Sequence, residues 1–393
     1  MADSKKTKLF TSDMPGAPVL SGTAGSLIAV LDAVLVNGFG LVSVTGLTVT
    51  GGIATATVSA GHSLRVDSVG LIAGAAPAGL NGEKRILSIA GNSFTFDATG
   101  IADQTATGAI TAKVAPAGWT KAFSGTNLAA YKSTAPEGTG FYLRVDDTGT
   151  TVARVRGYET VSDVNTGTGP FPTTADFAGS GLWWSKSNTA SAATRPWRIA
   201  ADDRGFYYFP RQFDTICEHQ GNYFGDILSL KSNDPYACVL RGNVSDRSAA
   251  TGGTFGDDLG MADSLRSYGG LYIARAANTL GSAVNIYSAP VIDTTLNGTH
   301  ATGSVGFAYP APVDNGLMLT PVVLHNTLGF RGYLPGIRYS PQVVNTAFNS
   351  GDVVAGSGDM AGKKVTAVRM GNLIATPSQC GVVFIDHTSD WRV

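Results

Sequence analysis

The sequence LVSVTGLTVTGGIATATV, residues 41–58, alternates apolar with polar or small side chains on both sides of the pair Gly51-Gly52. A period of two is typical of a strand with one buried face, because successive side chains of a strand point to opposite sides. Paired glycines readily adopt the positive φ angles of a tight turn. The stretch therefore predicts two short strands separated by a turn.

The same pattern continues to about residue 114. Further alternating segments and turns lie at residues 64–66, 81–82, 86–89, 91–92 and 94–96. Strands that recur every 8–12 residues or so, with such turns between them, predict a small β-sandwich or barrel. Residues 101–113, rich in Ala, Thr and Gly, are expected to add a final strand or a linker.

Composition extends this interpretation to the whole chain. The 393 residues include 50 glycines and only 15% charged residues. Helices accommodate glycine poorly, and a chain of this length exceeds the usual size of one hydrophobic core. We therefore expect an all-β protein with one short N-terminal helix and several small β-sandwich or β-barrel modules. The expected parts are an exposed N-terminal arm at residues 1–20, a helix plus sandwich or barrel at 21–115, an aromatic-rich β domain at 116–260 and a C-terminal β domain at 261–393.

One helix is predicted near the N-terminus. Apolar residues recur at helical spacing from Leu27 to Leu35, with Gly25-Ser26 before them and Asn37-Gly38 after them. Such flanking residues are typical of helix starts and stops. The helix is expected to pack on a sheet, with Asp32 facing solvent or a neighbouring chain.

Two aromatic hairpins are predicted in the middle of the chain. One has the turn Asp146-Asp-Thr-Gly149 and the other the turn Asp202-Asp-Arg-Gly205, each between aromatic strands. The turn glycine is expected in the left-handed conformation. The shared plan suggests an internal repeat of about 56 residues. Elsewhere, loops are predicted at residues 165–172, 185–195 and 239–260, and strands at 270–276, 283–292, 318–324, 365–370 and 380–386.

Charge and cysteine content argue against several classes of protein. The formal net charge is -1 and Lys and Arg are scattered, whereas phosphate binding needs a clustered basic field. Cys217, Cys238 and Cys380 do not form a disulfide framework, so folding in a reducing compartment is expected. Residues 1–10 are polar without a following secretory segment, and no apolar stretch reaches transmembrane length. We expect no nucleic acid partner, no signal peptide and no membrane insertion.

No motif predicts a catalytic or metal site. Cys217-Glu-His219 with Cys238 is the one local group of soft ligands, but zinc normally needs four ligands at closer spacing, so buried, unliganded cysteines are favoured. The acid pairs Asp146-Asp147, Asp202-Asp203 and Asp257-Asp258 are compatible with a glycosidase or with calcium binding. Turn hydrogen bonding explains the first two. We therefore predict no catalytic residue, metal or cofactor.

Aromatic residues offer a candidate interaction surface. Trp183 and Trp184 are compatible with a carbohydrate-binding platform, although aromatic residues on strands more often fill a core or a subunit interface. Phe10 and Met14 lie in the expected arm, which we expect to order on a partner. The candidate interaction residues are therefore Trp183, Trp184, Phe10 and Met14.

Several segments resemble structural proteins of tailed bacteriophages that infect Gram-negative hosts. These are residues 10–40 (FTSDMPGAPVLSGTAGSLIAVLDAVLVNGFG), 80–85 (LNGEKR), 118–131 (GWTKAFSGTNLAAY), 144–149 (RVDDTG) and 334–338 (LPGIR). The resemblance implies a virion component made in the host cytoplasm, assembled with copies of itself and with other virion proteins, in the tail or baseplate. It implies a structural protein rather than an enzyme, and it assigns no site residue.

Three other functions stay open from the sequence. The chain can decorate the capsid surface, or it can bind a host surface glycan at the tail tip through Trp183, Trp184 and nearby loops. A cell-wall or glycan hydrolase would use one of the acid pairs, whose two carboxylates must flank the scissile bond in a defined cleft.

Overall fold

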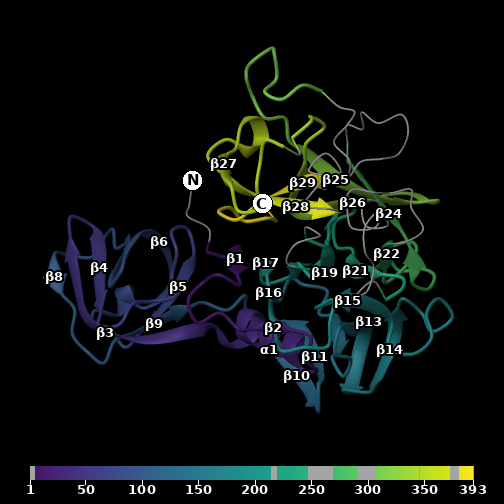
Figure 1. Cartoon of the computed structure of the whole chain (residues 1–393), viewed down its shortest axis with the longest axis horizontal. Coiled ribbons are helices and arrows are strands. Elements are labelled where there is room, and N and C mark those ends of the chain that lie inside the picture. The colour runs from purple at the N-terminus through teal and green to yellow at the C-terminus, as the bar shows by residue number, and fades with distance from the viewer. Residues whose placement is uncertain are drawn as a thin grey trace.

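The computed structural model of the chain describes residues 5–213, 219–246, 269–290, 307–344, 346–371 and 380–392. About 50% of the structure is strand and only 5% is helix, so the predicted all-β class is confirmed. A barrel, a large central sheet and a C-terminal sheet make up most of the molecule (Figure 1). Cys217 and Asp257-Asp258 lie outside the described residues. No helix in the described part of the chain is long and apolar enough to cross a membrane.

The barrel occupies residues 39–114. Its elements are β3 (Phe39–Thr50), β4 (Ile53–Val58), β5 (Val69–Ala73), the short helix η2 (Ala78–Leu80), β6 (Gly82–Ala90), β7 (Ser93–Asp97), β8 (Gln104–Thr105) and β9 (Thr111–Val114). The order β4-β7-β6-β5-β9-β3 closes because β3 also pairs with β4, and β8 adds to β3. Gly51 and Gly52 turn the chain between β3 and β4 with φ angles of 57° and 78°. The module predicted as a sandwich or barrel is therefore a closed six-stranded barrel.

The central sheet contains 13 strands. They are β1 (Lys8–Thr11), β10 (Trp119–Gly125), β11 (Leu128–Ser133), β12 (Tyr142–Asp146), β13 (Val152–Asp163), β14 (Thr166–Phe171), β15 (Leu182–Ser185), β17 (Trp197–Ala201), β18 (Gly205–Pro210), β19 (Asn222–Asp226), β21 (Cys238–Asn243), β22 (Gly269–Ile273) and β23 (Val284–Asn285). Its main path runs β1-β17-β18-β19-β21-β15-β13-β12-β11-β10, so β1 and β10 are its edges. A separate pair joins β2 (Leu20–Ser21) to β16 (Thr194–Arg195).

The C-terminal sheet has seven strands in the order β24-β25-β26-β29-β28-β27, with β20 paired to β26. Its elements are β20 (Leu228–Ser229), β24 (Tyr287–Pro290), β25 (Thr320–Asn326), β26 (Gly329–Tyr339), β27 (Val353–Ala355), the short helix η4 (Gly358–Met360), β28 (Lys364–Gly371) and β29 (Cys380–Asp386). The strands predicted at residues 318–324, 365–370 and 380–386 are confirmed as β25, β28 and β29.

The central sheet is the middle layer of the molecule, and β18 shows why. Phe206 and Tyr208 belong to the core shared with the barrel and the N-terminal helix. Tyr207 and Phe209 belong to a second core, shared with Leu324 and other residues of the C-terminal sheet. Because alternate side chains point to opposite faces, a strand buried on both faces needs a continuous run of large apolar residues.

The predicted helix is confirmed as α1 (Ser26–Leu31), which continues as the π-helix η1 (Asp32–Asn37) and ends at Gly38. The prediction that Asp32 faces solvent or another chain is wrong. Its carboxylate accepts hydrogen bonds from Lys121 Nζ at 2.5 Å and from Tyr131 Oη at 2.7 Å. These contacts tie the helix to β10 and β11 of the same chain.

The prediction of an exposed N-terminal arm is wrong at β1 and at Met14, whereas Val19 is 54% exposed. Lys8–Thr11 forms β1 and pairs antiparallel with β17. Phe10 is fully buried and Met14 is 3% exposed. A short segment can contribute a buried core side chain when its backbone hydrogen bonds to the edge of a sheet. Composition alone does not reveal such pairing.

The loop predicted at residues 165–172 is wrong, because residues 166–171 form β14. The loop predicted at residues 239–260 is wrong at its start, where β21 runs through Asn243, and residues 247–260 lie outside the described residues. Pairing with β13 and β19 overrides the weak strand propensity of their glycines, prolines and polar residues. Both predicted hairpins are confirmed as β12–β13 and β17–β18.

The conformation expected for the hairpin glycines is wrong, since neither Gly149 nor Gly205 has a positive φ angle. Close approach explains them instead. A Cβ atom would lie 2.4 Å from the Val152 carbonyl oxygen at Gly149, and 2.4 Å from Tyr223 Oη at Gly205. Each glycine therefore leaves room for a neighbouring oxygen.

Candidate functional site

The structure buries three of the four predicted interaction residues. Phe10, Met14 and Trp184 are almost fully enclosed by this chain, and Trp184 Nε1 donates to the Arg241 carbonyl at 2.7 Å. Trp183 points to the opposite face of β15, where it is half-buried under the Arg154 guanidinium at 3.5 Å from the ring centroid. The surface predicted from these residues is therefore wrong for all but Trp183: Phe10 and Met14 are buried, and Trp184 points to the opposite face of β15 from Trp183.

Of the predicted soft-ligand cluster, only His219 and Cys238 lie within the described residues. Among those residues, no group of three or more His, Cys, Asp or Glu side chains is placed to hold a metal ion. Burial raises the pKa of the Cys238 thiol well above its usual value and lowers the pKa of His219 well below its usual value. Both side chains are thus uncharged interior groups near neutral pH.

Asp147 and Lys186 form a completely buried ion pair. The Oδ2 atom of Asp147 accepts from the backbone N–H groups of Leu27 at 2.8 Å and Ile28 at 3.1 Å, at the start of α1. Lys186 Nζ donates to Asp147 Oδ1 and to two backbone carbonyls. Burial raises the pKa of Asp147, and the ammonium and helix N–H groups oppose that rise. The pair locks the helix onto the central sheet and is structural.

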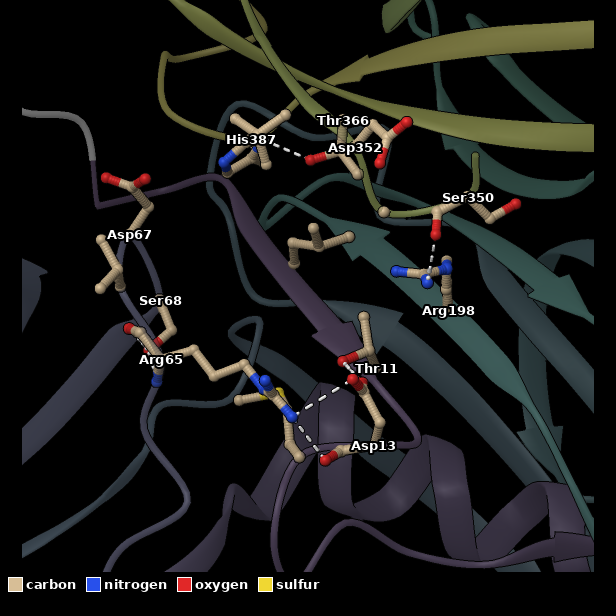
Figure 2. Close-up of a pocket in the computed structure, with 15 residues that line it drawn as sticks. Thr11, Asp13, Arg65, Asp67, Ser68, Arg198, Ser350, Asp352, Thr366 and His387 are labelled. Atoms are coloured by element: carbon tan, nitrogen blue, oxygen red, sulfur yellow. Dashed lines mark hydrogen bonds and ion pairs between the residues drawn. The ribbon is translucent and has the colours of Figure 1, made fainter. Parts of the chain in front are cut away.

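A pocket lies where the central sheet, the barrel and the C-terminal sheet meet. Its walls come from the segment around β1, the barrel loop at residues 65–68, Arg198 of β17, the turn at residues 350–353, Thr366 of β28 and His387 after β29. Figure 2 shows these side chains arranged around one opening, with Asp13 and Arg65 across from Ser350 and Arg198. The volume is about 430 Å³, within the usual range for small-molecule sites. We refer to it as the junction pocket.

Hydrogen bonds hold the polar groups of the junction pocket in place. Arg65 Nη2 donates to the Asp13 carbonyl at 2.6 Å and lies 3.2 Å from its carboxylate. Arg198 Nη2 donates to the Ser350 carbonyl at 3.0 Å (Figure 2). Burial opposes ionisation of Asp13, but the Thr11 hydroxyl and the guanidiniums of Arg65 and Arg198 lower its pKa overall. The site therefore presents fixed charges of both signs.

Two uncharged polar side chains, His387 and Thr366, also line the junction pocket. His387 Nδ1 lies 2.9 Å from Thr366 Oγ1, and both side chains are buried (Figure 2). Burial is the main reason that the pKa of His387 is lowered. The imidazole and hydroxyl are thus available as hydrogen-bonding groups without a net charge at neutral pH.

A second candidate site is apolar and exposed. It lies around the tip of the β25–β26 hairpin, where Leu280, Leu328 and Phe330 line a hollow of about 320 Å³. These three side chains are 71%, 71% and 69% exposed. Leu230 and Tyr287 adjoin them, since the Leu230 N–H donates to the Arg331 carbonyl at 3.1 Å and the rings of Tyr287, His325 and Phe330 follow one another. We define Leu230, Leu280, Tyr287, Leu328 and Phe330 as the hairpin patch.

Neither site had a signal in the sequence. The junction pocket draws on segments that are far apart in the chain, and single exposed apolar residues are common on protein surfaces. No known protein-family model matches this chain, and a search of the curated proteins finds no significant match. Function is therefore inferred from the chain's own side chains.

Proposed function

We propose that this chain is a structural component of a tailed-phage particle, in the tail or baseplate, which acts by assembling with copies of itself and with other virion proteins rather than by catalysis. The observation that carries the proposal is the hairpin patch, an exposed group of large apolar side chains at one end of the C-terminal sheet. The resemblance of residues 10–40 to phage structural proteins is the reason for proposing a virion.

Burial of the exposed hairpin patch against a partner would lower the free energy of the complex. Full burial of one leucine or phenylalanine side chain is worth about 1.5–3 kcal/mol, so the three leucines and one phenylalanine of the patch supply a sizeable driving force for association. Contiguous apolar surface of this kind is uncommon on proteins that work as monomers. In a symmetric pair the same patch meets itself, so that the Phe330 side chain of each copy would enter the hollow of the other.

The experiment measures mass in solution and content in particles. We expect the purified chain to associate with rising concentration in analytical ultracentrifugation. The double variant Leu328→Ser/Phe330→Ser should remain monomeric with an unchanged circular dichroism spectrum. The matched control is Leu41→Ser, which removes a leucine that is 67% exposed on β3 of the barrel and should associate like the wild type.

The second readout is the phage that encodes the chain. Mass spectrometry of purified particles should detect the wild-type chain, and particles made with the double variant should contain at least tenfold less. A wild-type chain that stays monomeric at every concentration and is missing from purified particles would refute the proposal.

A capsid decoration protein is compatible with the same patch, and copy number per particle separates it from a tail or baseplate protein. The alternative of a glycan-binding platform at Trp183 and Trp184 loses its basis, because Trp184 is completely buried.

A further inference from the structure

We propose that the junction pocket binds a neutral polyhydroxylated molecule, with the size of one or two sugar rings. This is a separate site from the hairpin patch and does not depend on assembly. The inference stands on four features of the pocket: its charge balance, its alternation of donors and acceptors, its apolar wall and its position between three sheets.

The charge balance argues against an ionic ligand. Two guanidiniums and three carboxylates line the pocket, and Lys364 Nζ, just outside it, lies 2.7 Å from Asp67 Oδ2. Three cations therefore face three anions. A phosphate, a carboxylate or an ammonium ion would gain attraction from one set and lose it to the other. A neutral ligand avoids this cancellation.

The lining alternates strong donors with strong acceptors. Arg65 and Arg198 can only donate, whereas the carboxylates of Asp13 and Asp352 supply acceptors. Asp352 forms no ion pair with a described residue, and its Oδ2 accepts a single hydrogen bond at 2.7 Å, from the Asn349 N–H. A hydroxyl group both donates and accepts, and neighbouring hydroxyls on a ring can bridge a carboxylate to a guanidinium. A polyol is therefore the class of ligand that uses this arrangement fully.

The pocket also has an apolar wall, formed by Leu9, Met14, Val66 and Val353. Val66 and Val353 remain 48% and 55% exposed at the rim. A sugar ring has C–H faces and hydroxyl edges, so it can lay a face on this wall while its hydroxyls reach the charged groups. A ligand without apolar surface would leave Val66 and Val353 uncovered.

Glycine keeps the mouth of the pocket open. Gly351 has a φ angle of 105°, and a Cβ atom there would lie 3.0 Å from Arg198 Nη2. The turn therefore brings its backbone against the guanidinium, with Asp352 beside it at the opening (Figure 2).

A bound ligand would touch all three sheets at once, because the lining residues belong to the central sheet, the barrel and the C-terminal sheet. Binding to the folded state alone stabilises a protein by mass action. We therefore expect the thermal midpoint to rise with the concentration of a suitable sugar.

The test is calorimetric titration and thermal shift of the full chain with glucose, galactose, mannose, N-acetylglucosamine and lactose. Sodium phosphate and ammonium chloride at matched ionic strength serve as ionic probes. We expect saturable binding of at least one sugar and none of either ion. Asp352→Asn keeps an oxygen that can accept from the Asn349 N–H, so the fold should persist, and sugar binding should weaken at least tenfold.

The matched control is Asp97→Asn, which removes an exposed carboxylate from β7 of the barrel and should bind like the wild type. Lack of binding by every sugar would overturn the inference, as would equal binding by both variants. Binding of phosphate or ammonium in place of the sugars would assign the pocket to an ion instead. Each of these results is independent of the ultracentrifugation result for the hairpin patch.

Discussion

The two hairpin turns share the pattern Asp-Asp-x-Gly and lie in the same sheet, yet they use their carboxylates differently. In the turn after β12, Asp146 accepts hydrogen bonds within the turn and Asp147 pairs with a cation from a distant segment. In the turn after β17, Asp202 does both. The difference distinguishes hydrogen bonds within a turn from an ion pair with a distant segment.

In the first turn, Asp146 accepts the hydrogen bonds within the turn. Its Oδ1 atom accepts from the Thr148 N–H at 3.3 Å and the Thr148 hydroxyl at 2.7 Å. Asp147 turns inward and meets Lys186 and the start of α1. Asp147 therefore stabilises the start of α1, and Asp146 stabilises the turn.

In the second turn, Asp202 Oδ1 accepts from the Arg204 N–H at 2.8 Å and the Gly205 N–H at 2.6 Å. Its Oδ2 atom accepts from Arg392 Nε at 2.7 Å, near the C-terminus. Asp203 remains half-buried beside it. The same four-residue pattern thus buries whichever carboxylate a cation from elsewhere in the chain can reach.

Removing the Asp147 carboxylate is expected to have the largest effect on stability. In Asp147→Ala the Lys186 ammonium stays buried without its anion, and two N–H groups of α1 lose their acceptor. Breaking a buried pair on one side costs about 3–5 kcal/mol. Urea unfolding followed by tryptophan fluorescence measures the loss.

A double variant tests whether the unpaired cation causes that loss. Asp147→Leu with Lys186→Met removes both charges, so it should recover at least half of the stability lost in Asp147→Ala. If the double variant is as unstable as Asp147→Ala, the unpaired ammonium is not the cause, and the contrast between the two turns loses its basis.

The Asp202→Ala variant is expected to lose less, about 1.5–3 kcal/mol, which is typical for hydrogen bonds to charged groups. Arg392 keeps its hydrogen bond to the Asp226 carbonyl at 3.1 Å, so its guanidinium retains one acceptor. Asp202→Asn is the control, because its amide oxygen can still cap the turn. The same urea assay applies, and a loss in Asp202→Ala larger than that in Asp147→Ala would reverse the proposed ranking.

Local patterns explain which parts of the fold could be predicted. The barrel strands, α1 and both hairpins have their signals in adjacent residues: alternation, helical spacing and turn residues. The role of Lys186 could not be predicted, because it lies in a polar stretch and its partner Asp147 is 39 positions away in the sequence. Nothing local distinguishes a buried lysine from a solvated one.

The candidate sites show the same limit. The junction pocket joins Asp13, Arg65, Arg198 and Asp352, which no short motif connects. The predicted surface failed for a related reason: Phe10 and Trp184 are apolar residues that the fold covers with other parts of the chain. Apolar composition identifies residues that seek burial, whereas pairing between distant strands decides whether this chain or a partner covers them.

The smallest expected effects concern Asp146 and Asp203, and they should have opposite signs. Although burial opposes ionisation of Asp146, hydrogen bonds from Thr148 and Ser180 lower its pKa, so its charge stabilises the fold above about pH 3.8 and that contribution is lost as the pH falls through the lowered pKa. Burial, followed by repulsion from Asp202, raises the pKa of Asp203, so its charge opposes folding once the pH rises above 3.8.

At pH 7, Asp146→Asn should therefore be slightly less stable than the wild type and Asp203→Asn slightly more stable, each by less than about 1 kcal/mol because water screens both sites. Urea midpoints measured between pH 3 and pH 7 should show both differences shrinking toward the acid end, where the carboxyls are protonated in the folded and unfolded states alike. Two variants that shift in the same direction at pH 7 would show that the carboxylate beside the buried one has the same role in both turns.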